Sequence, residues 1–233
     1  LFARAVAELK EFERPRIVGI TGTNGKSTTT ALVGHILKQC GKDVRVGGNI
    51  GVGVLDLDKL HGGAIYVLEL SSYQLDLAES LKCDVAVMLN LSPDHLSRHG
   101  GMDGYVQAKR RVFRNQGPAD WAIVGVDDTR SQVMCTQLTS EGLRKVMPVS
   151  AEYGLGRGVS VLEGQLADSM MGRSVAPHDI SKARALPGKH NHQNAAAAYA
   201  VCRALGLEPS DILAAMETFP GLPHRLELIG TLD

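Results

Sequence analysis

Short apolar runs alternate along the chain with longer segments in which apolar residues recur every three or four positions. Continuously apolar runs such as Ala64–Leu68 are typical of parallel strands that helices cover on both faces. Alternation of such runs with helical segments is typical of βαβ units. We therefore predict an α/β fold with a mostly parallel sheet flanked by helices. The expected strands are Ile17–Thr21, Val44–Val46, Ala64–Leu70, Val85–Asn90, Trp121–Gly125 and Lys145–Val149, and the expected helices are Ser27–Cys40, Gly104–Asn115, Thr129–Leu138, His190–Leu205 and Pro209–Thr218.

Two stretches interrupt this alternation. Residues 153–185 are rich in glycine and turn-forming residues, with a short β-like piece at Val159–Leu162, and we expect a small antiparallel β addition there. Near the C-terminus, Pro220–Pro223 (Pro-Gly-Leu-Pro) is a strong breaker of regular structure. We therefore expect residues 1–222 to form a central domain and residues 223–233 to be a linker and the start of a truncated further domain.

The composition restricts which partners the chain is expected to bind, and it restricts the fold much less. The formal net charge is zero, so we expect no general attraction to nucleic acid or to an anionic membrane. The longest stretch without Asp, Glu, Lys or Arg is thirteen residues, His190–Cys202, which is too short to span a bilayer. The amphipathic pattern of Leu1–Phe12 predicts a helix rather than a signal peptide, and the absence of an initiator Met suggests an excised fragment. Scattered cysteines without a Cys-x-x-Cys pair indicate buried thiols in a reducing cytoplasm: Cys40, Cys83, Cys135 and Cys202.

A glycine-rich turn after the first predicted strand carries the strongest chemical signal. Its two glycines allow a tight turn that points backbone N–H groups at an anion, and the following helix adds its positive N-terminal end. The lysine would reach the terminal phosphates of a nucleoside triphosphate, and the serine hydroxyl would bind Mg²⁺. The strict phosphate-loop pattern places another glycine where this chain has Ile20, so the match is to a shorter form. The alternative is a structural turn with a chance Lys-Ser pair. The seven residues are Gly22, Thr23, Asn24, Gly25, Lys26, Ser27 and Thr28.

Polar residues also follow the next strands at the carboxyl edge of the sheet, where ligands bind in open α/β folds. Glu69 ends an apolar strand and could hold Mg²⁺ directly or through water; alternatively it is an edge carboxylate that faces solvent. Asp94 and His95 follow the strand after it, and His95 is either a metal ligand or surface polarity. We interpret His99, beside two glycines, as a polar loop residue.

Three further positions carry little signal on local evidence. Lys109 lies in a Lys-Arg-Arg run on a predicted helix, a pattern usually typical of a solvated face. Asn49, among glycines, is by itself a turn residue. At the start of the last long helix, Asn191 is predicted to be the N-cap and Asn194 a polar residue of the first turn.

Taken together, these segments resemble the Mur ligases, the ATP-dependent amide-forming enzymes of peptidoglycan precursor synthesis. The resemblance covers essentially the whole chain. The short phosphate loop is the hallmark of a superfamily that includes the folylpolyglutamate synthetases. Three segments favour the member that joins D-glutamate to UDP-N-acetylmuramoyl-L-alanine: Gly47–Gly51, Leu68–Leu75 and Phe219–Arg225.

This resemblance implies roles for the individual residues. Two Mg²⁺ ions are expected, one beside the phosphate loop and one at His95, and the family carbamylates the lysine that corresponds to Lys109. The loop between His95 and Lys109 is about one residue shorter than the family pattern, so the last assignment rests on Tyr105, four residues earlier. The implied set is Lys26, His95 and Lys109 for catalysis, Ser27, Glu69, His95 and Lys109 for metal, Asn194 for adenine, Arg225 for ribose and Asn49 for the muramoyl substrate.

The family has three domains, and the resemblance implies that this chain is the central ATPase domain alone, a cytoplasmic monomer without its N- and C-terminal domains. The implied reaction passes through an acyl phosphate that the amine of D-glutamate attacks. Three alternatives are a GTPase-type switch, a related amide ligase such as a folylpolyglutamate synthetase, and a nucleotide-binding module without turnover. The sequence has neither the Asn-Lys-x-Asp nor the Asp-x-x-Gly motif that a GTPase requires.

Overall fold

The computed structural model describes residues 1–57, 60–170 and 177–222. These residues form one sheet of nine strands in the order β2-β3-β1-β4-β5-β6-β7-β8-β9. All neighbours from β2 to β7 pair in parallel, whereas β7–β8 and β8–β9 are antiparallel. The strands are β1 (Arg16–Thr21), β2 (Val44–Gly48), β3 (Ile65–Glu69), β4 (Val85–Met88), β5 (Trp121–Gly125), β6 (Lys145–Ser150), β7 (Val159–Leu162), β8 (Gln165–Asp168) and β9 (His178–Asp179).

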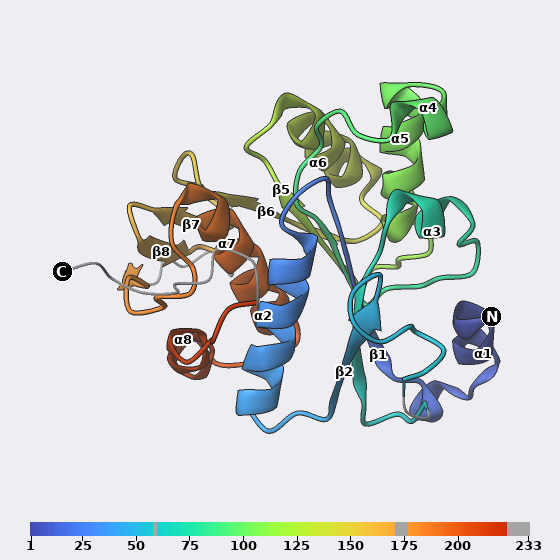
Figure 1. Ribbon diagram of the computed structural model, residues 1–233, viewed down its shortest axis with the longest axis horizontal. Coiled ribbons are helices and arrows are strands. Elements are labelled where there is room, and N and C mark those ends of the chain that lie inside the picture. The colour runs from blue at the N-terminus through green and yellow to red at the C-terminus, as the bar shows by residue number, and fades with distance from the viewer. Residues whose placement is uncertain (58–59, 171–176, 223–233) are drawn as a thin grey trace.

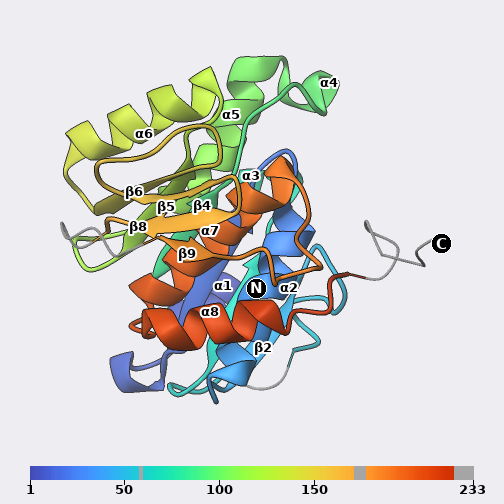
Figure 2. The same ribbon diagram turned by 90° about the vertical axis from the view of Figure 1, so that its left-hand side faces the viewer.

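Helices cover both faces of the sheet (Figures 1 and 2). On one side, α2, α7 and α8 pack against one another and against the strands. The other side is covered by α1, α3, α5 and α6. The helices are α1 (Phe2–Glu8), α2 (Lys26–Gln39), α3 (Ser72–Asp76), α4 (Leu96–His99), α5 (Met102–Arg110), α6 (Thr129–Glu141), α7 (Lys189–Ala204) and α8 (Pro209–Glu217), with 3₁₀ turns η1 (Glu11–Glu13) and η2 (Arg111–Phe113).

The continuously apolar strands supply two separate cores. In β4, Val85 and Val87 face the core shared with α2 and α7, whereas Ala86 and Met88 face the core shared with α3, α5 and α6. This follows from the strand geometry, because successive side chains point to opposite faces of a sheet. A strand that is covered on both faces therefore has no polar alternation, which confirms the prediction of a parallel, doubly covered sheet.

The predicted elements are confirmed within a few residues, and so is the antiparallel addition. It is a continuation of the main sheet, because β7 pairs in parallel with β6 before the direction reverses. Two short helices, α3 and α4, were not predicted, and the helix expected over Gly104–Asn115 is divided into α5 and η2. The N-terminal helix ends at Glu8 and η1 follows it. All four cysteines, which lie in the described residues, are free thiols. Cys83 and Cys202 are buried as expected, whereas Cys40 and Cys135 are only partly buried.

The prediction of Asn191 as the N-cap of α7 was wrong. The N-cap is Gly188, whose φ of 79° favours glycine, and the helix begins at Lys189. Asn191 lies inside the helix and donates a hydrogen bond from Nδ2 to the carbonyl of Pro187 (2.9 Å). Asn194 is consequently the sixth residue of the helix rather than a first-turn residue. Glycine at Gly188 permits this earlier start, and the Asn-based pattern does not reveal it.

Candidate functional site

The loop after β1 lies at the carboxyl edge of the parallel strands, where the chain connections diverge. From β1 the chain passes through α2 to β2 and β3 on one side, whereas β4 pairs with the other side of β1. The loops after β1, β3 and β4 therefore meet at a topological switch point, the usual ligand site of open α/β sheets. Figure 1 shows the loop between β1 and α2 at this edge.

Two glycines let this loop pass between its neighbours. Gly25 has a φ of 82°, and a Cβ there would lie 2.2 Å from Oδ1 of Asn194. Gly22 has a φ of 154°, and a Cβ there would lie 2.9 Å from the Cβ of Leu89. Helix α2 begins directly after Gly25, so its first N–H groups have no acceptor within the helix and its positive end faces the loop. The geometry suits a bound phosphate.

Lys26, the first residue of α2, folds back over the loop. Its Nζ donates hydrogen bonds to the carbonyl oxygens of Gly22 (3.1 Å) and Thr23 (2.8 Å). The next residue, Ser27, is buried in the first turn of the helix, and Thr28 is partly buried. The ammonium group is therefore held beside the backbone of the loop, where it can contact an anion that the loop binds.

Lys109 reaches the same loop from α5. Its side chain is buried, and its Nζ donates to the carbonyl of Gly22 (2.7 Å) and to Oγ1 of Thr21 (3.3 Å). The same atom lies 4.8 Å from the ring centroid of Tyr105. Burial, followed by the charge of Lys26, lowers the pKa of Lys109 from 10.5 to about 7, against the opposing charges of Asp94 and Glu69. The interpretation of Lys109 as part of a solvated face was wrong.

Glu69, the last residue of β3, is almost completely buried, with 2% of its surface exposed. One carboxylate oxygen, Oε1, accepts a hydrogen bond from Nδ2 of Asn49 (3.1 Å). The other, Oε2, is buried and has no hydrogen-bond partner among the described residues. A buried carboxylate oxygen without a donor needs compensation, and a cation such as Mg²⁺ supplies it. The interpretation of Glu69 as a solvent-facing edge carboxylate was wrong.

His95 lies in the loop after β4 and directly precedes α4. Its φ of 49° places it in the left-handed region, and its side chain is half exposed. Its Nε2 lies 3.5 Å from Oδ2 of Asp94, and its ring packs edge-on against that of Tyr73 at 5.2 Å. Tyr73 belongs to α3, so His95 is brought to the helix that follows Glu69. Within the described residues no group of three or more His, Cys, Asp or Glu side chains could hold a metal. A cation here would take its other ligands from hydroxyl, phosphate or water oxygens.

Asn49, which follows β2, forms hydrogen bonds to Glu69 through both its main chain and its side chain. Its backbone N–H donates to the Glu69 carbonyl (2.9 Å), and its Nδ2 donates to Oε1 of the same residue. Gly48, with a φ of 106°, allows this approach because a Cβ there would lie 2.3 Å from the Glu69 carbonyl oxygen. Asn49 is therefore more than a turn residue, since it holds the carboxylate in place.

Asn194 is buried beneath the phosphate loop. Its Oδ1 accepts from Oγ1 of Thr29 (3.2 Å), and its Nδ2 donates to Oδ1 of Asn191 (3.1 Å). Its side chain thus connects α7 to α2 behind Gly25. Arg225, the other residue expected to contact the nucleotide, lies outside the described residues.

Residues 20–202 match the model of the family described as the Mur ligase middle domain. The chain belongs to this family. Over 232 residues, which is 100% of the chain and 49% of the relative, this Mur ligase middle domain is 58% identical to a protein of Caulobacter vibrioides named UDP-N-acetylmuramoylalanine–D-glutamate ligase. The domain spans about half the length of the curated relatives it matches.

Solved structures show the same fold. A crystal structure of MurF from Acinetobacter baumannii superposes with a TM-score of 0.71 at 26% identity, over 99% of this Mur ligase domain and 51% of that chain. FolC of E. coli, in complex with DHPP and ADP, gives a TM-score of 0.68 at 20% identity, over 99% of this chain and 62% of that chain. The FolC likeness extends to the fold alone. The resemblance to Mur ligases that the short phosphate loop indicated is confirmed.

Sequence reasoning missed part of the polar framework of this Mur ligase domain. Nε2 of His99 lies 3.0 Å from Oγ of Ser72, and its ring contacts those of Tyr73 and Tyr105. The interpretation of His99 as a polar loop residue was therefore wrong. The hydroxyl of Tyr105 lies 3.2 Å from Oγ1 of Thr23 in the phosphate loop. Its position four residues before Lys109 on the same helix indicates that the two side chains are neighbours. Nothing in the sequence joins Tyr105 to Thr23 or His99 to α3.

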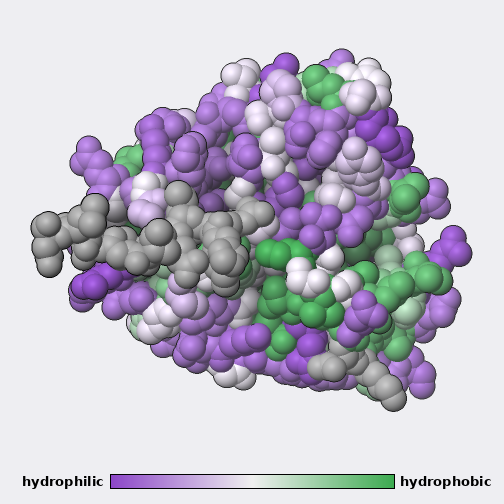
Figure 3. Space-filling model, viewed as in Figure 1, coloured by the Kyte–Doolittle hydropathy of each residue, from purple (hydrophilic) through white to green (hydrophobic). Residues whose placement is uncertain are grey.

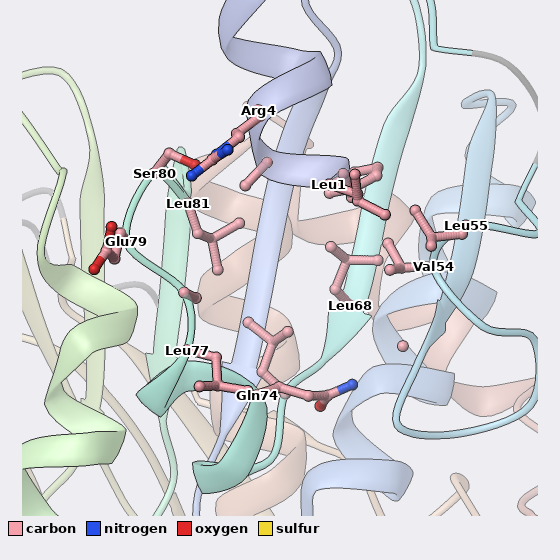
Figure 4. A pocket seen from close by; sticks show the side chains of 15 residues that line it. Leu1, Arg4, Val54, Leu55, Leu68, Gln74, Leu77, Glu79, Ser80 and Leu81 are labelled. Carbon is pink, nitrogen blue, oxygen red and sulfur yellow. The ribbon is translucent and has the colours of Figure 1, made fainter.

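A separate apolar pocket of about 500 Å³ lies between α1, α3 and the segment after β2. Figure 4 shows leucine and valine side chains that line it, among them Leu55 after β2, Leu68 of β3 and Leu81 after α3. Figure 3 shows hydrophobic surface, in green, on this face of the Mur ligase domain. Of the residues that line the pocket, Leu1 and Leu77 are largely exposed. Apolar side chains predominate in its lining, and the described residues that line it include none from the loop after β1.

Proposed function

We propose that this domain binds MgATP in a ligase that joins D-glutamate to UDP-N-acetylmuramoyl-L-alanine. The observation that carries the proposal is the buried Glu69 carboxylate, whose Oε2 has no donor in the described structure, at the same sheet edge as the phosphate loop. The name of the 58% identical relative supports the choice of substrates.

We propose a role for each residue of the site. The phosphate loop and Lys26 bind the phosphates, and Asn194 on α7 is proposed to contact the adenine. Mg²⁺ would be held by Ser27 and Glu69, with His95 and Lys109 at a second ion, and would supply charge neutralisation during phosphoryl transfer. Asn49, beside Glu69, is proposed to contact the muramoyl substrate, and Arg225 the ribose.

Lys109 suits the proposed carbamylation. An ammonium group would repel Mg²⁺, whereas a carbamate offers the anionic oxygen ligands that Mg²⁺ prefers. With a pKa of about 7, a large fraction of the Lys109 side chain is a neutral amine near neutral pH. The amine nitrogen forms a bond to the carbon of CO₂, one C=O π pair moves to oxygen, and one N–H proton leaves to solvent. Burial protects the product from water.

The proposed reaction has two steps. The terminal carboxylate of UDP-N-acetylmuramoyl-L-alanine attacks the γ-phosphorus of ATP, so an acyl phosphate forms as the bond to ADP breaks. The amine of D-glutamate then attacks the acyl carbon, loses a proton, and expels phosphate to leave the amide. The loop N–H groups and Lys26 hold the triphosphate in line and offset its charge, which is the largest contribution expected of such a site.

We further propose that residues 1–222 are the central ATP-binding domain and residues 223–233 a linker into a further domain. The remaining length of the relatives would then supply the UDP and amino acid sites. The proposed setting is a cytoplasmic monomer without nucleic acid or membrane partners. In the described part of the chain no helix has both the length and the apolar character needed to cross a membrane.

Binding of an ATP analogue tests this function. We expect the chain to bind a non-hydrolysable ATP analogue weakly, more tightly with Mg²⁺ than without, in titration calorimetry. We expect no D-glutamate-dependent phosphate release from the chain alone, because the surfaces for UDP and for D-glutamate are not part of the proposed central domain. Absence of binding would refute the nucleotide site, and amide formation by the chain alone would refute the domain assignment.

The alternatives find less support. A GTPase-type switch lacks its sequence motifs. A different amide ligase is not favoured, because the high identity is to relatives named as the D-glutamate ligase. A nucleotide-binding module without turnover is what we expect of this chain when it is alone.

A further inference from the structure

We propose that Asn90 is a positioning residue that holds the phosphate loop in its nucleotide-binding form. It does so through a relay of side chains that continues through Gln193 to Asp127. The inference rests on the proposed nucleotide site and adds a residue to it that touches neither the reacting atoms nor the proposed metal ligands.

Asn90 binds two consecutive residues of the loop. Its backbone carbonyl accepts a hydrogen bond from the N–H of Thr23 (2.9 Å). Its side chain forms a pair of bonds with the backbone of Asn24, in which Oδ1 accepts from the N–H (2.8 Å) and Nδ2 donates to the carbonyl (3.2 Å). These bonds fix the backbone directly before Gly25 and Lys26, so they determine where the following N–H groups point.

The orientation of the Asn90 amide is set by its other neighbour. Nδ2 of Asn90 also donates to Oε1 of Gln193 (3.1 Å), and Nε2 of Gln193 donates to Oδ2 of Asp127 (2.8 Å). A carboxylate has only acceptors, so Asp127 turns the NH₂ of Gln193 toward itself and the Gln193 oxygen toward Asn90. That oxygen in turn faces the NH₂ of Asn90, which leaves Oδ1 to accept from the loop. The carboxylate thereby fixes the direction of the whole relay.

Asp127, at the far end of the relay, is held in place by two further hydrogen bonds. Oδ1 of Asp127 accepts from Oγ of Ser150 (2.5 Å), and Oδ2 accepts from the N–H of Ala151 (2.9 Å). Gly125, at the end of β5, leaves room for the amide, because a Cβ there would lie 2.9 Å from Nε2 of Gln193. The relay thus ties the loop after β1 to the ends of β4, β5 and β6.

The relay also lies next to Asn194, the residue that is proposed to contact the adenine. Gln193 precedes Asn194, whose side chain packs behind Gly25. Gln193 therefore contacts the loop through Asn90, and its neighbour Asn194 contacts the loop's other side through Thr29 of α2. The relay residues line a polar pocket of about 230 Å³. Water from this pocket could replace a lost partner but would not impose the direction that Asp127 imposes.

The test uses Asn90→Asp, which keeps the size of the side chain and the Oδ1 acceptor. The new oxygen would face the carbonyl of Asn24 and Oε1 of Gln193, both of which are acceptors. We expect the chain to bind a Mg²⁺-loaded ATP analogue about tenfold more weakly in calorimetry. The matched control is Asn115→Asp, because Nδ2 of Asn115 also donates to two carbonyls, those of Glu79 and Leu81, which belong to neither the loop nor the relay. The control should bind as the wild type does.

Asp127→Asn supplies a second, more distant perturbation. It removes the carboxylate that sets the direction of Gln193, so we expect weaker binding of the same analogue although the change is two side chains away from the loop. The double variant Asn90→Asp/Asp127→Asn should bind only slightly more weakly than the weaker single variant, because both changes break one relay. A merely structural role would give additive losses that follow the fall in melting temperature.

The outcomes separate the relay from the proposed function. If the wild-type chain does not bind the analogue, the nucleotide site is refuted, and the relay with it. If the wild type binds and Asn90→Asp binds equally well, only the relay is refuted. Should Asn90→Asp fail to melt cooperatively, unchanged binding by Asp127→Asn overturns the proposal and weakened binding by a folded Asp127→Asn supports it.

Discussion

Replacing Lys109 with methionine should change how the stability of the chain depends on pH. Lys109 is buried, and its Nζ is surrounded by the carbonyl of Gly22, the hydroxyl of Thr21 and the ring of Tyr105. Methionine keeps the length and the apolar stem of the side chain but carries no charge. The comparison therefore isolates the cost of burying the ammonium group in metal-free, CO₂-free buffer.

The size of the effect follows from the pKa. Burial and the charge of Lys26 lower the pKa of Lys109 from 10.5 to about 7 in the folded chain. The folded state therefore holds the proton less tightly than the unfolded state. Between pH 7 and pH 10.5 the unfolded chain binds more protons, so this group makes the folded state more stable as the pH rises. The penalty is fully present below pH 7, and across the whole window it amounts to roughly 5 kcal/mol.

Urea denaturation at pH 7 and pH 9 measures this difference. We expect the free energy of unfolding of the wild type, relative to Lys109→Met, to rise by about 2 to 3 kcal/mol between the two pH values. Lys38→Met, at an exposed position of α2, is the control for the substitution itself and should run parallel to the wild type. If the free energy of unfolding changed by the same amount between the two pH values in Lys109→Met and in the wild type, the Lys109 ammonium would not be destabilised by its surroundings.

Three further predictions concern the site. In the intact ligase Lys26→Ala should lose at least about 100-fold in kcat/KM, because its ammonium group lies beside the loop that is proposed to hold the triphosphate. Its side chain is only partly buried, so we expect little change in melting temperature. Wild-type turnover would contradict the proposed role. Glu69→Gln should abolish the gain in ATP-analogue affinity that Mg²⁺ gives the chain, and an equal gain in both proteins would exclude Glu69 as a ligand. Lys109→Ala in the intact ligase should be nearly inactive. Acetate should restore part of the activity, because it can occupy the position of a carbamate. Full activity of the variant, or no effect of acetate on it, would refute carbamylation.

The fold was predictable because its signals are local. Apolar runs without alternation gave the doubly covered parallel strands, and the glycines of the loop marked the turn into α2. The chemistry of the site was less accessible, because burial depends on contacts between distant segments. Glu69 was assigned to metal binding from its place at the carboxyl edge of the sheet, with a solvent-facing carboxylate as the alternative. Lys109 was assigned to metal binding only through resemblance, because local evidence favoured a solvated helix face. Both are buried because β3 pairs with β1 and because α5 brings Lys109 to the loop that follows β1.

The short form of the phosphate loop has a structural explanation in the same contacts. The strict pattern requires a glycine where this chain has Ile20. Ile20 is fully buried in β1 and pairs with Glu69 of β3 and Val87 of β4, so the strand continues to Thr21 and the turn begins only at Gly22. A loop that starts later has fewer residues with which to hold its own shape. Here Asn90, from the neighbouring strand end, supplies the missing hydrogen bonds to the loop backbone. The pattern is matched only in part because Ile20 belongs to the strand, and the hydrogen bonds that hold the shorter loop include those from a residue outside it.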